Sequence, residues 1–381
     1  MNNWERKTLS DCCVSIADGD HQPPPKAKTG VPFVTISNID ATNHFDFSDT
    51  MFVPPEYYEN LDEKRKARKN DILYSVVGSF GIPVFIKEDK PFVFQRHIAI
   101  LRPNERIVPR FLYYSMLSKD FYAKADAAAI GAAQRTVSLS ALRNMKIDVP
   151  PIETQEKIAS VLSAYDDLIE NNQKQIRLLE EAARRLYKEW FVDFRFPGYE
   201  SVTITDGVPL GWRQTTIDAL VPIVTGKKDA NFGTSDGAYP FFTCAQEPIK
   251  APSFSFDDSA VILAGNGDFN VKVYRGKFEA YQRTYVVIPY EIDNLFLVFH
   301  TIAQNMDTLV KGASGSTIKF LTKGMIANIR LSIPDALTLT AFNQNCEALQ
   351  KKLEVSKAVI QLAQEARDRL LPKLMSGELE V

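Results

Sequence analysis

A segment near the start of the chain recurs 208 positions further along, and this internal repeat limits the possible folds more than any other feature. The matched pairs are Trp4 with Trp212, Thr8 with Thr216, Leu9 with Ile217, and Pro32–Thr35 with Pro240–Thr243. Two separated motifs that share one offset are difficult to obtain by chance. A chain of 381 residues, at ~150 residues per domain, has room for two such units.

Later matches keep the same order at smaller offsets, as deletions in loops would produce. They pair Gln95-Arg96 with Gln282-Arg283, Gly131-Ala132 with Gly312-Ala313, Thr136-Val137 with Thr317-Ile318, Ile147–Pro150 with Leu331–Pro334, and Glu181-Ala182 with Glu365-Ala366. Chance similarity between β-rich segments is the alternative. The ordered series favours a duplicated architecture.

Each repeat has two parts of different character. The first parts, residues 1–150 and 199–334, are rich in Pro, Gly, aromatic residues and short β-favouring runs such as DILYSVV and YVVIPY. The second parts, residues 151–198 and 335–381, carry helix formers with apolar residues at helical spacing. The sequence therefore predicts an α/β (α+β) protein with two similar mixed α/β domains, each followed by a long helix.

Apolar residues in each second part follow a heptad seam, in which steps of four and three residues alternate. The first seam runs through Ile158, Leu162, Tyr165, Ile169, Asn172, Ile176, Leu179, Ala183, Leu186 and Trp190. The second, 184 positions later, runs through Phe342, Cys346, Leu349, Leu353, Ser356, Ile360, Ala363, Arg367, Leu370 and Leu374. Asn172 and Ser356 place a polar break at the same step of both seams, which is typical of a register-setting device. We expect Arg367 at a frayed or exposed point.

The matched seams predict an antiparallel two-helix coiled coil with pseudo-twofold symmetry. The second domain provides the long return path that antiparallel pairing needs. From Ile158 to Trp190 the seam covers 32 steps, or about 48 Å at ~1.5 Å per residue, so the helices would act as a spacer between the domains. Two unrelated amphipathic helices, each packed only on its own domain, are the alternative.

Composition and charge exclude several functional classes. Lys and Arg number 45 against 47 Asp and Glu, so the formal net charge of −2 does not indicate a nucleic-acid binder. The 4 cysteines and 4 histidines have neither metal-ligand spacing nor the density of a disulfide framework. No apolar run approaches the ~18 residues of a membrane span, and the start of the chain lacks the apolar core of a signal peptide. We therefore expect a cytoplasmic protein without a metal site.

Three helical segments resemble a known family. PPIETQEKI at 150–158, LLEEAARRLYKEWF at 178–191 and RLLPKLMSGEL at 369–379 are similar to conserved regions of the specificity subunit of type I restriction-modification enzymes. The starts of the two repeats, W-x3-T-L and G-W-R-x2-T-I, resemble the starts of its two target-recognition domains. The resemblance covers the whole chain, and the helical segments are its specific part.

The resemblance implies a sequence-specific DNA-binding subunit without chemistry of its own. Each target-recognition domain would bind one half of a bipartite double-stranded DNA target. The helices would dock two methyltransferase (modification) subunits, and motor-nuclease (restriction) subunits would join them. The residues agree, because the chain lacks a G-x4-G-K-[ST] loop, a glycine-rich strand-to-helix turn for S-adenosylmethionine, and an Asn/Asp-Pro-Pro-aromatic motif. We expect neither enzyme activity nor a bound cofactor.

Phosphate contacts are expected from local basic clusters, because neither recognition domain is basic overall. The candidates are the run Lys64, Arg65, Lys66, Arg68 and Lys69, and two loop pairs at corresponding places in the repeats, Lys26 with Lys28 and Lys227 with Lys228. For the run, a solvated helix face with intrahelical pairing to Asp62 and Glu63 is the alternative.

Base reading needs forked donors or amides, since Arg pairs with guanine and Gln with adenine through two bonds each. The repeated dipeptides Gln95-Arg96 and Gln282-Arg283 fit this requirement, although each follows an aromatic strand and could instead cap the sheet. Small-residue loops, whose backbone can approach phosphate, supply the further candidates Gln134, Arg135, Thr136, Ser316, Thr317 and Lys319.

Aromatic residues outside the first seam predict a surface for protein partners. We expect Tyr187, Phe191 and Phe194 to point outward and to dock the methyltransferase subunits. Two other functions stay open: a coiled-coil scaffold that joins protein partners without binding DNA, and a DNA reader of another defence complex. The salt dependence of DNA affinity separates a DNA reader from a scaffold.

Overall fold

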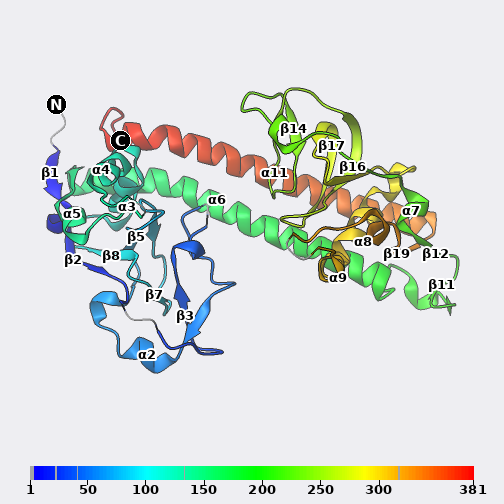
Figure 1. Ribbon diagram of the computed structural model, residues 1–381, viewed down its shortest axis with the longest axis horizontal. Helices are drawn as coiled ribbons and strands as arrows, with labels where there is room; N and C mark the ends of the chain where they lie inside the picture. Colours follow the sequence, from blue (N-terminus) through cyan, green and yellow to red (C-terminus); the bar gives the residue numbers. More distant parts are fainter. Residues whose placement is uncertain (1–3, 22–23, 41, 133, 316–317) are drawn as a thin grey trace. The chain divides into compact units, whose positions relative to one another are not determined.

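The computed structural model describes residues 4–21, 24–40, 42–132, 134–315 and 318–381. Contacts divide the chain into two compact units, a first unit of Met1–Asn172 with Ala358–Val381 and a second unit of Gln173–Lys357. Both long helices, α6 (Ile152–Tyr187) and α11 (Ala336–Met375), contribute to both units (Figure 1). The division therefore falls within the helices and not at their ends.

Two sheets form the globular part of the first unit. Antiparallel strands in the order β2-β8-β5-β6 make the larger sheet, and β4-β3-β7 make the smaller one, in which β3 and β7 are parallel. The bounds are β2 (Cys13–Asp18), β8 (Ile98–Pro103), β5 (Ile72–Ser75), β6 (Pro83–Phe85), β4 (Met51–Val53), β3 (Val31–Val34) and β7 (Val93–Phe94).

Strand β5 shows why the apolar runs of this sequence fold as strands covered on both faces. All its residues are buried, and successive side chains enter different cores because they alternate in direction along a strand. Ile72 and Tyr74 join a core with the helices α3 (Pro109–Leu117) and α4 (Lys119–Ala128), whereas Leu73 joins a core that contains residues of the smaller sheet. The larger sheet thus lies between helices and the smaller sheet.

The second unit repeats this strand order in one six-stranded sheet, β13-β18-β16-β17-β14-β15. The bounds are β13 (Ile223–Thr225), β18 (Thr284–Val287), β16 (Phe256–Ala264), β17 (Val271–Ala280), β14 (Tyr239–Phe242) and β15 (Ile249–Ala251). The parallel pair is kept, now between β14 and the end of β17. The 10-residue strand β17 thereby takes the places of both β6 and β7.

The strand pair that closes each domain reproduces the offsets found in the sequence. β1 (Glu5–Thr8) pairs with β9 (Lys146–Val149), and β12 (Arg213–Thr216) pairs with β19 (Arg330–Ile333). Glu5 faces Val149 in the first pair and Arg213 faces Ile333 in the second, which gives offsets of 208 and 184. The predicted repeat of one mixed α/β fold is confirmed.

Short elements complete the two domains. The remaining bounds are α1 (Leu9–Cys12), α2 (Pro55–Glu59) and α5 (Leu139–Asn144) in the first unit, and β10 (Ile204–Thr205), β11 (Val208–Pro209), α7 (Ile217–Leu220), α8 (Leu295–Gln304), α9 (Met306–Gly312) and α10 (Lys323–Ala327) in the second. Within the described residues, no helix combines the length and apolar character needed to cross a bilayer.

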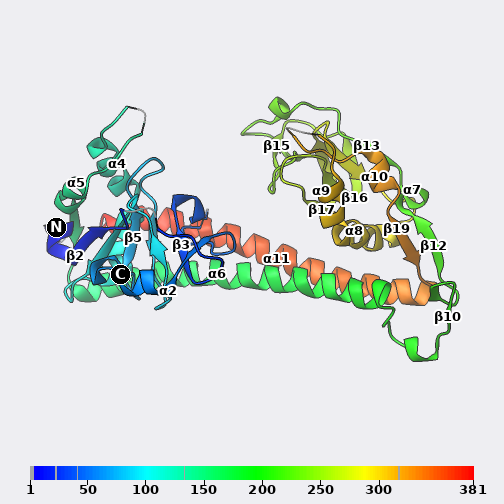
Figure 2. The same cartoon turned by 60° about the horizontal axis from the view of Figure 1, so that its bottom comes forward.

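The long helices pair antiparallel within each unit. In the first unit, Arg367 contacts Asp166 and Lys157 reaches the carbonyl oxygen of Val381, so residue numbers rise along one helix as they fall along the other. Figures 1 and 2 both show the start of α6 beside the end of α11. In the second unit, Ser356 donates to Gln175 Oε1 at 3.4 Å, and the ring of Phe342 packs near that of Trp190. The predicted antiparallel pairing is confirmed.

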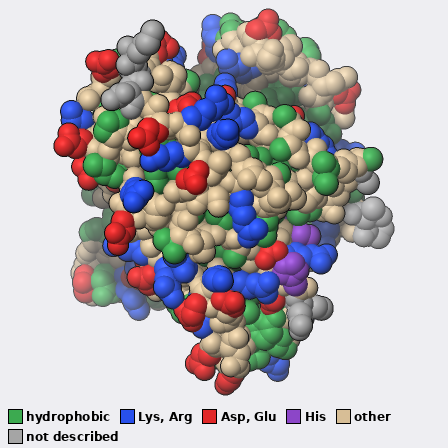
Figure 3. Space-filling model, turned by 90° about the vertical axis from the view of Figure 1, so that its left-hand side faces the viewer, with side chains coloured by type: hydrophobic (Ala, Val, Ile, Leu, Met, Phe, Trp, Pro, Cys, Tyr) green, Lys and Arg blue, Asp and Glu red, His purple; other side chains and the backbone are tan. Residues whose placement is uncertain are grey.

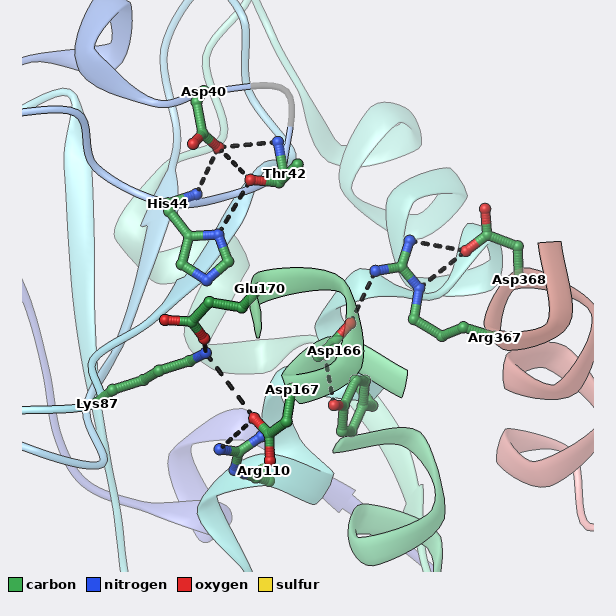
Figure 4. A network of polar contacts seen from close by, with 11 residues as sticks. Asp40, Thr42, His44, Lys87, Arg110, Asp166, Asp167, Glu170, Arg367 and Asp368 are labelled. Atoms are coloured by element: carbon green, nitrogen blue, oxygen red, sulfur yellow. Dashed lines mark hydrogen bonds and ion pairs between the residues drawn. The ribbon is translucent and has the colours of Figure 1, made fainter. Parts of the chain in front are cut away.

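Every predicted seam residue is buried or half-buried, including Arg367, whose expected exposure is wrong. Its side chain is 20% exposed, and Nη1 donates to Asp166 Oδ1 at 2.8 Å (Figure 4). Tyr114 Oη donates to the other oxygen of that carboxylate at 2.6 Å. Burial would lower the pKa of Arg367, but hydrogen bonds and charges of Asp166 and Asp368 outweigh it and the net shift is upward. The guanidinium is tolerated because acids neutralise it inside the seam.

The two polar seam residues make different hydrogen bonds. Both side chains are buried, Asn172 at 8% and Ser356 at 3% exposure. The Asn172 amide donates to the Leu168 carbonyl of its own helix at 2.9 Å, whereas Ser356 donates across to Gln175 on α6. Equal sequence position therefore does not give equal bonding.

Candidate nucleic-acid interface

Four loops of the first unit meet at the edge of the sheets where β2 and β5 end, and we call them the first loop cluster. They are residues 19–21, 76–80, 95–97 and 130–136, apart from 133. The amide groups of Asp20, Arg96, Val76 and Gly78 donate to the carbonyl oxygens of Phe94, Asp20, His97 and Arg135, at 2.9 to 3.0 Å. These bonds join neighbouring loops into one continuous surface.

The second unit has an equivalent second loop cluster. It consists of residues 226–228, 265–268, 281–283 and 314–320, apart from 316 and 317. The amide groups of Gln282, Gly265 and Leu321 donate to the carbonyl oxygens of Lys228, Arg283 and Gly265, at 2.8 to 2.9 Å. The same edge of the fold is therefore built in the same way twice.

A glycine at the first loop of each cluster allows the close approach on which this edge depends. A Cβ atom on Gly19 would lie 2.3 Å from the carbonyl oxygen of Phe94, and one on Gly226 would lie 1.9 Å from that of Ala280. Real Cβ atoms do not come this close to a backbone oxygen. Only glycine lets this loop lie against the strand end.

Most of the predicted DNA-contact residues lie in the two clusters. They are Gln95, Arg96, Gln134, Arg135 and Thr136 in the first cluster, and Lys227, Lys228, Gln282, Arg283 and Lys319 in the second. Lys26 and Lys28 are exposed further along the loop between β2 and β3. Ser316 and Thr317 lie outside the described residues. The structure thus brings together candidates that lie up to 41 residues apart in the first unit and up to 92 residues apart in the second.

The backbone corrects the alignment of the repeated dipeptides. Gln95 N donates to the carbonyl oxygen of Val34 at 3.3 Å, and Tyr281 N donates to that of Phe242 at 2.9 Å. Gln95 therefore corresponds to Tyr281, and Arg96 corresponds to Gln282. The sequence match is wrong by one residue because the connection through β6 and β7 differs in length from the continuous β17.

The alignment of the last loop is also corrected. Ile130 and Thr136 exchange two backbone hydrogen bonds, as Ser314 and Phe320 do, at 3.0 and 2.8 Å in both pairs. Thr136 therefore corresponds to Phe320, three residues beyond the position that the sequence match gives. Two cations, Arg135 and Lys319, now fall at the same place.

The basic run at residues 64–69 does not form one cationic patch. Only Glu63–Arg65 is helical, as a single 3-10 turn, so a solvated helix face is absent from this described segment. Arg65 turns toward the loop cluster, where its guanidinium lies 3.6 Å from Asp18 and 3.9 Å from Asp20.

The other cations of this run have different surroundings. Lys66 Nζ lies 2.7 Å from Glu63 Oε1, and Arg68 pairs with the second oxygen of the same carboxylate. Lys64 and Lys69 are exposed and form no ion pair with any described residue. Of the five cations, Arg65, Lys66 and Arg68 therefore have acidic partners, whereas Lys64 and Lys69 have none among the described residues.

A buried carboxylate that no sequence pattern predicted supports the first loop cluster. Asp20 is 8% exposed, and its side chain accepts a hydrogen bond from Tyr57 Oη. Burial, followed by this bond, raises the pKa of Tyr57 to about 12. A cavity of about 540 Å³ opens here, lined in part by His21 and Arg65. The acid–glycine–acid run at 18–20, just before a proline-rich loop, is the signal that could have found it.

Basic and acidic side chains are interspersed on the described surface seen in Figure 3. Single cations of the loop clusters also contact neighbouring side chains: Arg135 pairs with Asp126 and lies over the ring of Phe80, and Lys228 Nζ lies 4.4 Å from the ring centroid of Phe232. Such cations are positioned by neighbours, so they suit directed contacts better than diffuse attraction.

The predicted outward orientation of Tyr187, Phe191 and Phe194 is wrong. Tyr187 and Phe191 are each 6% exposed and belong to the core of the second unit, and Phe194 packs edge-on against Trp212. A π-helical turn, Lys188–Val192, follows α6 and changes the helical phase for Phe191 and the residues after it. The three aromatic side chains hold the domain to the helix instead of facing a partner.

Comparisons with known proteins agree with this architecture. Residues 1–181 match the family model described as the type I restriction modification DNA specificity domain. The EcoDI specificity subunit of Escherichia coli is 39% identical over 176 residues, which covers 45% of this chain and 39% of that protein. The putative MjaX specificity subunit of Methanocaldococcus jannaschii is 23% identical over 407 residues, covering 100% of this chain and 94% of that protein.

A solved structure shows the same fold over nearly the whole chain. The S subunit of a type I restriction-modification system from M. genitalium matches with a TM-score of 0.62 and 16% identity, covering 98% of this chain and 96% of that one. The duplicated α/β fold with long pairing helices is thus shared with that S subunit. Residues 1–181 match that family's model, and the chain as a whole is similar to type I restriction-modification specificity subunits.

Proposed function

We propose that this chain is the sequence-specific DNA-binding subunit of a type I restriction-modification complex, and that each unit reads one half of a bipartite DNA target. The observation that supports this proposal is the duplicated loop cluster. Several backbone hydrogen bonds recur in both clusters, whereas the exposed side chains differ, for example Arg96 in one and Gln282 in the other. Two copies of one scaffold with different loop residues suit the reading of two different sequences.

Methylation mapping tests this function. The chain is expressed with the methyltransferase subunit encoded beside it, and methylated bases are mapped in the host genome. We expect two specific blocks separated by unread base pairs, and DNA affinity that falls steeply as salt rises. A chain that binds its partners but has no salt-dependent DNA affinity would be a scaffold. A chain that binds DNA specifically but never supports methylation would serve another complex.

The proposal includes phosphate contacts by Lys64 and Lys69, the two lysines of the basic run without an ion pair. Lys64 and Lys69 are exposed on the first domain and form no ion pair among the described residues. Replacing both with alanine should weaken binding to all sequences about equally and lower the slope of log affinity against log salt by about 2. Replacing the ion-paired Lys66 alone should change the slope less. A loss confined to one target sequence would contradict a phosphate role.

Docking of two methyltransferase subunits, with restriction subunits added, is the second part of the proposal. Because Tyr187, Phe191 and Phe194 pack within the second unit, another surface must serve. Leu178 on α6 and Leu362 on α11 are 62% and 66% exposed, and they are 184 positions apart, the offset of the two seams. One exposed leucine at the same place in each repeat suits two copies of one partner.

Native mass spectrometry tests this docking. Leu178→Ser and Leu362→Ser should each reduce the number of bound methyltransferase copies from two to one, and the double variant should bind none. Leu337→Ser is the matched control, because Leu337 is 84% exposed on α11 and its counterpart 184 positions earlier is Glu153. Two bound copies in the double variant would exclude these leucines from the interface.

A further inference from the structure

The turn after the parallel strand pair has the same backbone frame in both units. The matched bonds, from amide nitrogen to carbonyl oxygen, are Arg96 to Asp20 and Gln282 to Lys228, both at 2.9 Å, and Ile98 to Gln95 and Thr284 to Tyr281, at 3.0 and 2.8 Å. This frame fixes the position of each backbone. Arg96 and Gln282 therefore leave the fold from equivalent points, in loops held by the rigid sheet.

The residues at this position are two of the types that read bases through paired hydrogen bonds. A guanidinium donates to O6 and N7 of guanine, and a carboxamide donates to N7 and accepts from N6 of adenine. Both Arg96 and Gln282 are exposed. Among the described residues, none forms an ion pair or a side-chain hydrogen bond with Arg96, so its donors are available.

The residue on the neighbouring loop also differs between the two units, and in each unit it suits the side chain at the turn. Gln282 Nε2 donates to Asp229 Oδ1 at 2.6 Å, which orients the amide and leaves one N–H and the carbonyl oxygen for a base. The residue equivalent to Asp229 is His21, which contacts Asp18 and not Arg96. An acid at that place would pair with the guanidinium and compete with guanine.

We propose that this turn position reads one base pair in each half-site, with Arg96 recognising guanine in the first and Gln282 recognising adenine in the second. The proposal rests on the proposed DNA-reading function and assigns a base identity to a residue within it. Each unit then discriminates at one position of its half-site through a single exposed side chain.

An exchange of the two turn environments tests the proposal in the full chain with its methyltransferase subunit. The Asp229→His/Gln282→Arg variant should change one position of the second block from A·T to G·C, with a preference of about 5- to 150-fold, and leave the first block unchanged. The reciprocal His21→Asp/Arg96→Gln variant should change one position of the first block from G·C to A·T. Gln214→Arg, an exposed change on β12 outside the loop clusters, should keep the parent target.

Each other outcome has a defined meaning. A variant that methylates the unchanged parent target overturns the base assignment while the proposed function stands. If a variant does not methylate, its complex is used to select bound sequences from randomised DNA duplexes. The assignment is also overturned if the selected base is unchanged, if selectivity is lost across a whole block, or if neither variant enriches any sequence. A parent complex that neither methylates nor selects DNA rejects the proposed function itself.

Discussion

The two units share one fold but differ in the contacts that hold their helices. In the first unit, polar contacts add to the apolar core: Tyr114 and Arg367 share the carboxylate of Asp166, and Lys87 pairs with Glu170 (Figure 4). In the second unit an aromatic cluster surrounds Phe342, whose ring centroid lies 4.7 Å from that of Phe191, 5.8 Å from His300 and 6.0 Å from Trp190. The strand pairing fixes the fold, so the domain-to-helix contacts are free to differ.

Equivalent helix positions show how this difference arises. The offset of 184 relates Asp166 to Gln350 and Ala183 to Arg367, so the charged pair of the first unit has a neutral counterpart in the second. Gln350 and Ala183 line a groove of about 900 Å³ within the second unit. Side chains that meet in one unit thus border an open space in the other.

Removal of the central ring of the aromatic cluster should give the largest effect. Phe342 is fully buried, and Phe342→Ala should lower the free energy of unfolding of the second unit by about 3 to 5 kcal/mol. The matched control is Ile158→Ala at the equivalent seam position of the first unit, where a smaller side chain is removed. Hydrogen exchange with mass spectrometry resolves the two units. Equal loss of protection in both units from Phe342→Ala would contradict separate cores.

A buried histidine should make the second unit the more acid-sensitive one. Burial lowers the pKa of His300 from 6.5 to about 4, so the unfolded chain binds the proton more tightly. Stability is therefore full above about pH 6.5 and falls by up to about 3 kcal/mol as the pH drops to about 4.

Urea unfolding followed by tryptophan fluorescence measures this loss, because two of the three tryptophans, Trp190 and Trp212, lie in the second unit. His300→Phe keeps an aromatic ring beside Tyr187 and should remove this part of the pH dependence. An unchanged pH profile in that variant would assign the acid sensitivity to other groups.

The charged pair of the first unit should give a smaller effect that depends on which partner remains. Asp166→Gln leaves Arg367 half-buried with Asp368 alone and should cost about 2 kcal/mol, below the value for fully buried pairs because the two side chains are 13% and 20% exposed. Adding Arg367→Ala reproduces the residues of the second unit and should recover part of the loss. A double-mutant cycle by urea unfolding measures the coupling, and strictly additive losses would show that the pair does not act together.

The sequence predicted the elements that a repeated or periodic residue pattern specifies, but not the contacts between distant segments. Heptad spacing and one shared offset were enough for the duplicated fold and the antiparallel seams. The burial of Arg367 depends on Asp166, which lies 201 residues away, so no local pattern reveals it. The direction of Phe191 depends on a π-helical turn that interrupts the helical phase, and the loop-cluster alignment depends on connection lengths that differ between the units.

Loss of the exposed ion pair between Arg275 and Glu347 should have the smallest effect on the free energy of unfolding. This change tests whether polar contacts also hold the helix in the second unit. Arg275 on β17 makes two bonds to Glu347 on α11, at 2.9 and 2.7 Å, but the side chains are 42% and 32% exposed. The Arg275 hydrogen bond holds the pKa of Glu347 below its usual value, so the contribution is present at neutral pH and lost as the pH falls through that lowered pKa. Glu347→Gln should cost about 0.5 kcal/mol in low salt and almost nothing in 1 M salt, because water and ions screen exposed charges. Urea unfolding at two salt concentrations measures the difference. A loss as large as that of Asp166→Gln, unchanged by salt, would mean that charged contacts hold the helix in the second unit as well.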